Sequence, residues 1–260
     1  MTFFVRMFLN IRMRRPCLAA NWKMNKTIPE ALEFVHSFLP SVSGIHDADI
    51  VLAPPFTPLF AIAEKLAGTE VKLAAQNVFY EEKGAFTGEV SPVMLRDAGC
   101  EYVIVGHSER RQYFHESDEI INRKIKASLK SGLRVIFCIG ESLSERETGK
   151  TFEVLAGQIR NGLRDVDGEG LIVAYEPVWA IGTGKTATPE QAQEAHSYIR
   201  SRLREVFAGR ADTIRILYGG SVTPENIDRL MACPDVDGGL VGGASLKSES
   251  FERIVKFKRG

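Results

Sequence analysis

Short apolar runs alternate along the chain with longer stretches in which hydrophobic and polar residues recur at helical spacing. Most of the runs are hydrophobic at nearly every position, which is typical of parallel strands that helices cover on both faces. This alternation repeats about every 30 residues, the length of one strand–helix–strand unit, although the sequence itself is not repeated. The predicted strands are CLAANW (17–22), DIVLA (49–53), VKLAAQ (71–76), YVIVG (102–106), RVIFCIG (134–140), LIVAYE (171–176), IRILYG (214–219) and GGLVGG (238–243).

The stretches between these runs carry the signals that begin and end helices. The segment TPEQ (188–191) offers an N-cap threonine, a proline in the first turn and a glutamine that completes a capping box. Thr223 and Pro224 repeat the cap and the proline, and Ser117 precedes two acidic residues. Gly132 follows a lysine as a C-terminal stop signal. The pattern therefore predicts helices between the strands.

Eight strand–helix units in one chain of this length predict an α/β fold, a single (β/α)8 (TIM) barrel with a parallel eight-stranded core, over residues 13–260. An open doubly wound sheet is the alternative. That fold usually has a GxGxxG turn after its first strand, whereas here the first strand ends in NWKMN, which contains no glycine.

Residues 1–12 form an N-terminal extension outside the predicted barrel. They are apolar and basic without any acidic residue, a composition that weakly suggests a targeting peptide. Arg6 and Arg12 interrupt the apolar run, however, and no cleavage site of small residues follows it. An extension, or translation from an upstream start codon with Met13 as a second start, is the preferred interpretation.

The composition of the chain argues against several classes of binding partner. The formal net charge is +0, whereas a general nucleic-acid binder carries a basic excess. The four cysteines lie far apart without a CxxC pair, which argues against a disulfide framework or a zinc site and favours buried thiols in a reducing, cytoplasmic compartment. No apolar run approaches the ~18 residues that a membrane span needs. We expect no metal, no nucleic acid and no membrane partner.

Three reactive side chains follow predicted strands. In a (β/α)8 barrel the chemistry lies where strands end and the following loops begin. Lys23 follows the first strand, His107 the fourth, and Glu176 closes the sixth. A lysine there is usually a solvated loop residue, and a histidine is usually a hydrogen-bonded structural one. A carboxylate that ends a fully apolar strand is different, because burial raises its pKa toward the range of a general base.

Paired glycines follow the seventh and eighth strands, in YGGS (218–221) and VGGAS (241–245). Glycines before a helix allow backbone N–H groups to approach an anion closely. Together the strand ends place a cation, an imidazole, a carboxylate and a two-loop phosphate site at one end of the barrel. The segment GTGKT (182–186) is not a P-loop, because Trp179 occupies the position where that motif needs its first glycine.

Five motifs resemble the triosephosphate isomerases: NWKMN (21–25), GHSERR (106–111), AYEPVWAIGTGKTA (174–187), YGGSV (218–222) and VGGASL (241–246). The resemblance runs from about residue 15 to the C-terminus in the same order. One departure is Ala20, where the family often has glycine. The resemblance implies interconversion of dihydroxyacetone phosphate and D-glyceraldehyde 3-phosphate through an enediolate, in glycolysis and gluconeogenesis, without a metal or cofactor.

The resemblance also assigns roles to residues. Glu176 would be the base, and His107 a neutral electrophile, a pairing for which this family is the standard example. Lys23 would supply positive charge, positioned by Glu109, although a structural ion pair of Glu109 with an arginine is an equal alternative. Residues 177–187 would form a lid. The implied substrate-binding residues are Asn21, Lys23, Gly182, Ser221, Gly242 and Gly243.

The resemblance further implies a homodimer. The long segment QNVFYEEKGAFTGEVSP (76–92) would insert into a second subunit, with Thr87 at its tip and Arg110 among the residues that receive it. A mobile surface loop is the alternative.

Two other function classes stay open. An aldolase on the same barrel would need a Schiff-base lysine inside a strand, and only Lys72 is available, without an acidic neighbour. An inactive binding scaffold would be expected to lack Lys23, His107 or Glu176.

Overall fold

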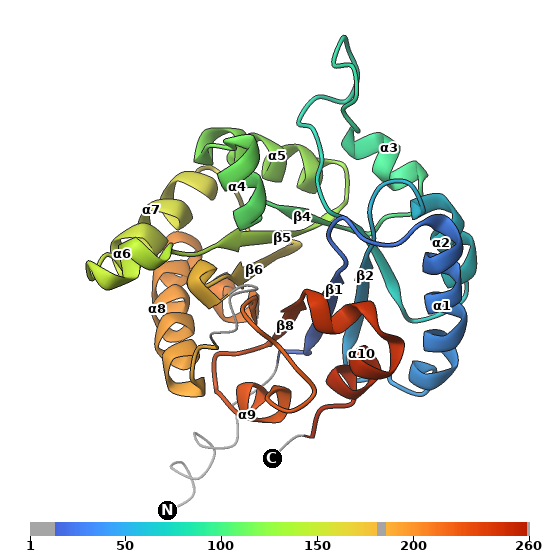
Figure 1. Cartoon of the computed structure of the whole chain (residues 1–260). Coiled ribbons are helices and arrows are strands. Elements are labelled where there is room, and N and C mark those ends of the chain that lie inside the picture. The colour runs from blue at the N-terminus through green and yellow to red at the C-terminus, as the bar shows by residue number, and fades with distance from the viewer. Residues whose placement is uncertain (1–13, 181–185, 259–260) are drawn as a thin grey trace, which may run out of the picture.

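The computed structural model describes residues 14–180 and 186–258. Its strands pair in sequence order into a closed, all-parallel barrel in which β8 returns to β1, and Figure 1 shows helices arranged as a ring around them. The predicted (β/α)8 barrel is therefore confirmed. The strands are β1 (Cys17–Asn21), β2 (Asp49–Ala53), β3 (Lys72–Ala75), β4 (Tyr102–Val105), β5 (Arg134–Ile139), β6 (Leu171–Tyr175), β7 (Arg215–Tyr218) and β8 (Gly238–Val241).

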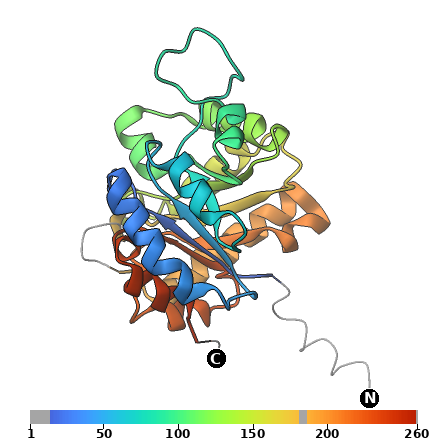
Figure 2. The same cartoon turned by 90° about the vertical axis from the view of Figure 1, so that its right-hand side faces the viewer.

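Helices connect successive strands and cover the outside of the barrel (Figures 1 and 2). Over residues 14–180 and 186–258 the α-helices are α1 (Ile28–Val42), α2 (Leu59–Leu66), α3 (Pro92–Asp97), α4 (Ser108–Phe114), α5 (Asp118–Lys130), α6 (Leu143–Glu147), α7 (Thr151–Gly162), α8 (Pro189–Phe207), α9 (Ile227–Met231) and α10 (Ser248–Val255). Short 3₁₀-helices are η2 (Val178–Ala180), η3 (Ala208–Thr213) and η4 (Gly243–Leu246). None of these helices has the length and apolarity that a bilayer crossing requires.

The barrel has two hydrophobic layers, because successive side chains of a strand point to opposite faces. Along β1, Cys17 and Ala19 belong to the cluster inside the barrel, whereas Leu18 and Ala20 belong to the layer between strands and helices. All of them are fully buried. Burial on both faces explains why the strands appear in the sequence as continuous apolar runs rather than alternating ones.

Most predicted helix boundaries are confirmed. Thr188 caps α8 with a complete capping box, and Ser117 caps α5. Gly132 follows α5 with a φ of +83°, the left-handed conformation in which glycine commonly ends a helix.

The predicted helix start at Thr223 is wrong, because α9 begins only at Ile227. The Asn226 side chain accepts a hydrogen bond from the Thr223 N–H (2.8 Å) and donates one to the Ser221 carbonyl oxygen (2.9 Å). Thr223 Oγ1 also accepts a hydrogen bond from the Glu225 N–H (3.3 Å). These side-chain bonds satisfy backbone groups of a turn that leads into α9, so Thr223 caps this turn and the helix begins after it.

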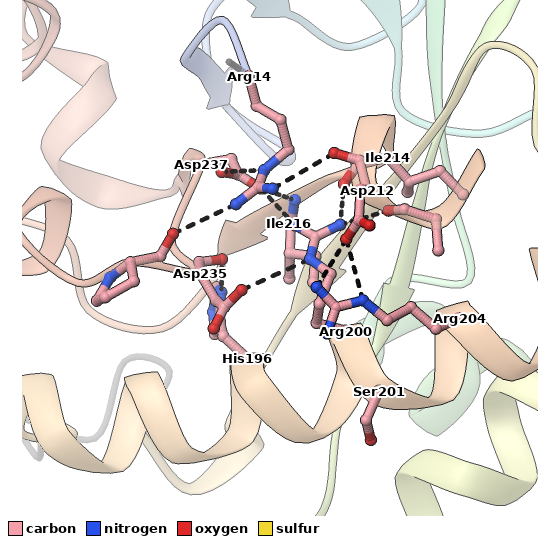
Figure 3. A network of polar contacts seen from close by, with 12 residues as sticks. Arg14, His196, Arg200, Ser201, Arg204, Asp212, Ile214, Ile216, Asp235 and Asp237 are labelled. Atoms are coloured by element: carbon pink, nitrogen blue, oxygen red, sulfur yellow. Dashed lines mark hydrogen bonds and ion pairs between the residues drawn. The ribbon is translucent and has the colours of Figure 1, made fainter. Parts of the chain in front are cut away.

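A buried ionic network ties α8 to the amino-terminal ends of β7 and β8 (Figure 3). The Arg200 guanidinium, 2 % exposed, lies 2.8 Å from Asp237 and donates to the carbonyl oxygens of Ala211 and Ile214. Asp237 also pairs with Arg14 at 2.7 Å. Since every buried charge in this network has an opposite partner, the network holds the loops at this end of the barrel together.

His196 on α8 borders the same network (Figure 3) and is fully buried. Its Nδ1–H donates to the Asp235 carbonyl oxygen at 3.0 Å, and its Nε2 has no hydrogen-bond partner among the described residues. Burial lowers the pKa of His196 to about 4, because the imidazolium form would have to be desolvated. The folded protein therefore contains a neutral imidazole at this position.

We predict that His196 makes the fold sensitive to acid. Its folded-state pKa of about 4 lies below its usual 6.5, so the unfolded chain binds more protons in that window. The stability that neutral His196 contributes is complete above pH 6.5 and decreases toward pH 4, by about 3 kcal/mol in total. Unfolding free energies measured by denaturant at several pH values should fall less steeply for His196→Asn than for wild type. The exposed His36→Asn variant is the control, and an unchanged slope for His196→Asn would contradict the assignment.

Candidate functional site

Two of the predicted side chains touch at the carboxyl-terminal ends of the strands. Glu176 directly follows β6, and His107 lies two residues after the end of β4. His107 Nε2 lies 2.9 Å from Glu176 Oε1, and the Ser108 N–H donates to Glu176 Oε2 at 2.9 Å. Glu176 is 2 % and His107 6 % exposed. The carboxylate and the imidazole thus form a desolvated pair.

The hydrogen bonds of His107 define its tautomer. His107 is the N-cap residue of α4, and its Nδ1 accepts a hydrogen bond from the Glu109 N–H at 3.2 Å. In the neutral ring the proton is therefore on Nε2, which donates to Glu176. The imidazole presents an N–H group toward the centre of the site.

The charges of this pair depend on their contact. Burial acts to raise the pKa of Glu176, but the charge and hydrogen bond of His107, with smaller effects of the Ser108 N–H and the Lys23 charge, outweigh burial and hold this pKa below the usual 4.5. Burial likewise acts to lower the pKa of His107, and Glu176 raises it above 6.5. When the two groups separate, burial and the amino terminus of α4 both favour the neutral imidazole.

Hydrogen bonds to its backbone fix the position of Lys23 next to His107 and Glu176. It adopts a left-handed φ of +53°, and its N–H donates to Asn21 Oδ1 at 3.1 Å. The Gln76 side chain donates to the Lys23 carbonyl oxygen at 2.9 Å. The Lys23 ammonium lies 2.6 Å from Glu109 Oε1. Glu109 therefore pairs with Lys23 and not with an arginine, the alternative that the sequence left open. Gln76 was not predicted, because its contact crosses from the end of β3 to the loop after β1.

The two glycine loops also reach this end of the barrel. A Cβ atom added to Gly242 would lie 3.6 Å from Lys23 Cε, so the loop after β8 borders the lysine. In the part of the chain that the structure describes, the N–H groups of Ser221 and Gly242 donate no backbone hydrogen bond. Gly243 begins η4 with open space where its side chain would be. These groups can receive an anion, and Gly182 lies outside the described residues.

Two glycines flank Glu176 in a role that the sequence did not indicate. An added Cβ at Gly140, after β5, would lie 1.8 Å from the Glu176 carbonyl oxygen, and one at Gly219, after β7, would lie 2.9 Å from Glu176 Cγ. Since β5 and β7 are the neighbours of β6, the missing side chains make room for the backbone and side chain of Glu176. The signal available was a glycine at the end of each neighbouring strand.

Glu141 anchors the segment that follows Glu176, and it too was not predicted. Its carboxylate is fully buried and accepts hydrogen bonds from Trp179 Nε1 (2.9 Å) and the Tyr175 hydroxyl (3.1 Å). Arg146 pairs with it at 3.2 Å and lies over the Trp179 ring at 4.5 Å. Glu141 therefore positions both ends of the short stretch that contains Glu176. Within residues 14–180 and 186–258, no group of three or more His, Cys, Asp or Glu residues could hold a metal ion.

A closed parallel barrel with a carboxylate, an imidazole and an ammonium group at the carboxyl ends of its strands defines a (β/α)8-barrel enzyme with an acid–base site. The sequence model of the family described as triosephosphate isomerase matches residues 16–258. The chain belongs to the triosephosphate isomerase family and is therefore an isomerase.

Several curated relatives carry the name triosephosphate isomerase. One from Geobacter metallireducens is 58 % identical over 95 % of this chain and 100 % of its own length. One from Endomicrobium trichonymphae is 53 % identical with the same coverage of both chains. A third, from Carboxydothermus hydrogenoformans, is 55 % identical over 94 % of this chain and 99 % of its own. Since nearly the whole of each relative is matched, the similarity extends over the complete barrel.

We predict that Gly219→Ala impairs catalysis by displacing Glu176. The added methyl would lie 2.9 Å from Glu176 Cγ, and a shift of a reacting group by even about 1 Å can cost about 100-fold in rate. The kcat of Gly219→Ala should fall about 10- to 100-fold. Gly209→Ala is the matched control, because nothing lies within 4 Å of its added Cβ. Equal kcat values for the two variants would show that Gly219 does not shape the site.

Proposed function

We propose that Glu176, His107 and Lys23 catalyse the interconversion of dihydroxyacetone phosphate and D-glyceraldehyde 3-phosphate, the reaction of the triosephosphate isomerase family and a step of glycolysis and gluconeogenesis. The observation that carries these assignments is the direct contact of His107 Nε2 with Glu176 Oε1 at 2.9 Å. This contact joins a carboxylate base to a hydrogen-bond donor, the two groups that proton abstraction next to a carbonyl requires.

The reaction proceeds through two proton transfers at carbon. Glu176 removes a proton from the carbon next to the carbonyl, and the bonding electrons move onto the carbonyl oxygen to give an enediolate. The His107 Nε2–H stabilises that oxygen and moves protons between the two oxygens. Glu176 then returns the proton to the neighbouring carbon. The Lys23 ammonium stabilises the negative charge that develops on oxygen.

Substrate binding has to separate the catalytic pair. A substrate oxygen that accepts from His107 Nε2 takes the place that Glu176 Oε1 occupies at 2.9 Å. Glu176 then loses the contact that lowers its pKa but stays buried, and burial alone raises the pKa of a carboxyl group. The arrival of substrate thus converts a weak, stabilised carboxylate into a stronger base.

The phosphate group binds to backbone N–H groups and to the positive charge near them. Ser221, Gly242 and Gly243 supply N–H groups from the loops after β7 and β8, together with Gly182 as the family resemblance implies. A Cβ atom added to Gly242 would lie only 3.6 Å from Lys23 Cε, and this proximity of the loop to Lys23 supports a phosphate held next to the ammonium. Asn21 contributes by fixing the left-handed turn at Lys23.

Residues 13–260 form the catalytic domain, and residues 1–12 are an extension to it. The family match over residues 16–258 supports this division. A cytoplasmic location is in keeping with four buried cysteine thiols, since thiols stay reduced in that compartment.

Glu176→Gln tests the assignment of the base. A positioned general base contributes about 10²–10⁴-fold in rate, so kcat should fall by at least this range while KM changes little, as measured with purified protein in a coupled assay on glyceraldehyde 3-phosphate. The exposed Glu33→Gln variant is the control for loss of one carboxylate. A Glu176→Gln enzyme that keeps a tenth of the wild-type kcat would place the base elsewhere.

A homodimer completes the proposal. The loop around Thr87 projects from the barrel (Figures 1 and 2), and residues 82–89 are exposed. Phe86 packs against Phe79 with ring centroids 4.6 Å apart, yet it remains 42 % exposed. Met24, directly after Lys23, is 95 % exposed. Burial of such apolar groups favours association, so a second subunit would cover the tip of the loop and stabilise the segment that carries Lys23.

We predict that Phe86→Asp weakens the dimer. A charge placed in an apolar interface has to be desolvated, so sedimentation at micromolar concentration should show a dimer for wild type and dissociation for the variant, with loss of activity. Leu143→Asp on α6 is the matched control, since Leu143 is 41 % exposed. A fully active wild-type monomer at assay concentrations would contradict the dimer.

A further inference from the structure

A large cavity lies at the end of the barrel opposite Glu176. It has a volume of about 1250 Å³ and is lined by residues at the starts of β2, β5, β6 and β7 and by the segment before β1. Its charged residues include Arg15, Asp49, Arg134 and Arg215. The proposed reaction uses none of these four side chains.

Three arginines converge on one carboxylate in this cavity. Asp49 Oδ1 lies 2.7 Å from Arg15 Nε, and Asp49 Oδ2 accepts a hydrogen bond from Arg215 Nη1 and lies 3.8 Å from Arg134 Nη1. Tyr102 is 1 % exposed. Its hydroxyl donates a hydrogen bond to Asp49 (3.3 Å) and accepts one from Arg134 (2.8 Å). Both oxygens of Asp49 are therefore occupied, and this cluster (Arg15, Arg134, Arg215 and Asp49) carries a net charge of about +2.

The excess charge sets this cluster apart from the ionic network of Figure 3, which lies at the same end of the barrel. That network balances three arginines against three aspartates: Arg14, Arg200 and Arg204 with Asp212, Asp235 and Asp237. Three further cationic residues that line the cavity have their own partners: Lys126 pairs with Asp165, Lys130 with Glu82, and Arg210 with Glu169. The uncompensated positive charge is thus concentrated around Asp49.

The cluster still has donors available. The side chains of Arg15 and Arg134 are 46 % and 54 % exposed. Among the residues that the structure describes, Arg215 makes its side-chain hydrogen bonds and ion pairs with Asp49 alone. Each guanidinium has five N–H donors in a planar fork that matches the oxygens of a phosphate group. One small anion could reach all three arginines, because all three contact the same carboxylate.

We propose that the cluster of Arg15, Arg134 and Arg215 binds a small phosphorylated anion with two or more negative charges, of the phosphate or pyrophosphate class. The charge of such an anion balances the excess of the cluster, and the cavity has room for a diphosphate with an attached group. The chain's own first residues are not suited to this role, since residues 1–13 contain two arginines and no acidic residue. The site is separate from the catalytic phosphate loops, which lie at the other end of the strands.

Calorimetric titration with inorganic pyrophosphate tests the proposal. The titration is made on the full-length Lys23→Met variant, in which anion binding at the catalytic site is weakened. Adding Arg15→Gln and Arg134→Gln to this background should lower the remaining pyrophosphate affinity about tenfold or more, because charge-assisted hydrogen bonds are lost. Adding Arg160→Gln and Arg229→Gln, two exposed arginines outside the cavity, removes the same charge and should leave the affinity within twofold.

Two further measurements sharpen the result. In an otherwise wild-type chain, Arg15→Gln with Arg134→Gln should retain the wild-type kcat and thermal midpoint, which separates this site from the catalytic one and from damage to the fold. Inorganic phosphate should bind the cluster more weakly than pyrophosphate. The proposal is overturned if the Lys23→Met protein does not bind pyrophosphate, or if the cavity pair and the control pair of substitutions have the same effect on affinity.

Discussion

The contact between Glu176 and His107 is the interaction on which the site depends. Both groups are buried, and burial alone would push both toward their neutral forms. With His107 Nε2 and Glu176 Oε1 2.9 Å apart, each group instead stabilises the charged form of the other. A ligand oxygen that accepts the hydrogen bond from His107 Nε2–H replaces Glu176 as the acceptor. Binding of such a ligand therefore also raises the pKa of the Glu176 carboxylate.

The barrel makes this contact possible across an intervening strand. Glu176 follows β6 and His107 follows β4, so β5 lies between them. The chain after β5 approaches Glu176 so closely that Gly140 has no room for a Cβ atom. On the other side, Gly219 leaves space for the Glu176 side chain. The two glycines and the shared direction of all strands explain how residues about 70 positions apart in the sequence form one pair.

Much of this arrangement could be predicted from the sequence, because parallel strands buried on both faces appear as uninterrupted apolar runs. The runs located every strand to within two residues, and reactive residues at their ends indicated Lys23, His107 and Glu176 as one group. The helix start at Thr223 was mistaken, since Thr223 caps a turn that the Asn226 side chain closes, and α9 begins only after that turn. Gly140, Gly219 and Glu141 act across neighbouring strands. Their roles require the three-dimensional packing, which a pattern along one chain does not contain.

The charged side chains are arranged differently at the two ends of the barrel. At the amino-terminal end Arg200 and Asp237 are buried in a balanced network that links helices and strands. At the carboxyl-terminal end the charged groups lie within reach of a ligand, and the ammonium of Lys23 is 27 % exposed as a side chain. For the catalytic site and the buried network, this division follows the general pattern of (β/α)8 barrels, in which one rim stabilises the fold and the other carries the chemistry. The proposed anion site around Asp49 is an addition at the amino-terminal end.

The most direct test of the central claim, that Glu176 carries the proton between the two carbons, is to follow deuterium in heavy water. The abstracted proton rests on the Glu176 carboxyl group during the lifetime of the enediolate and exchanges there with heavy water that enters the site. Product formed by the wild-type enzyme should therefore contain deuterium at the carbon that is protonated. In Glu176→Gln, deuterium incorporation and isomerisation should fall together by the same factor. If incorporation persists at the wild-type rate while isomerisation is lost, another group removes the proton, and the account of this site is wrong.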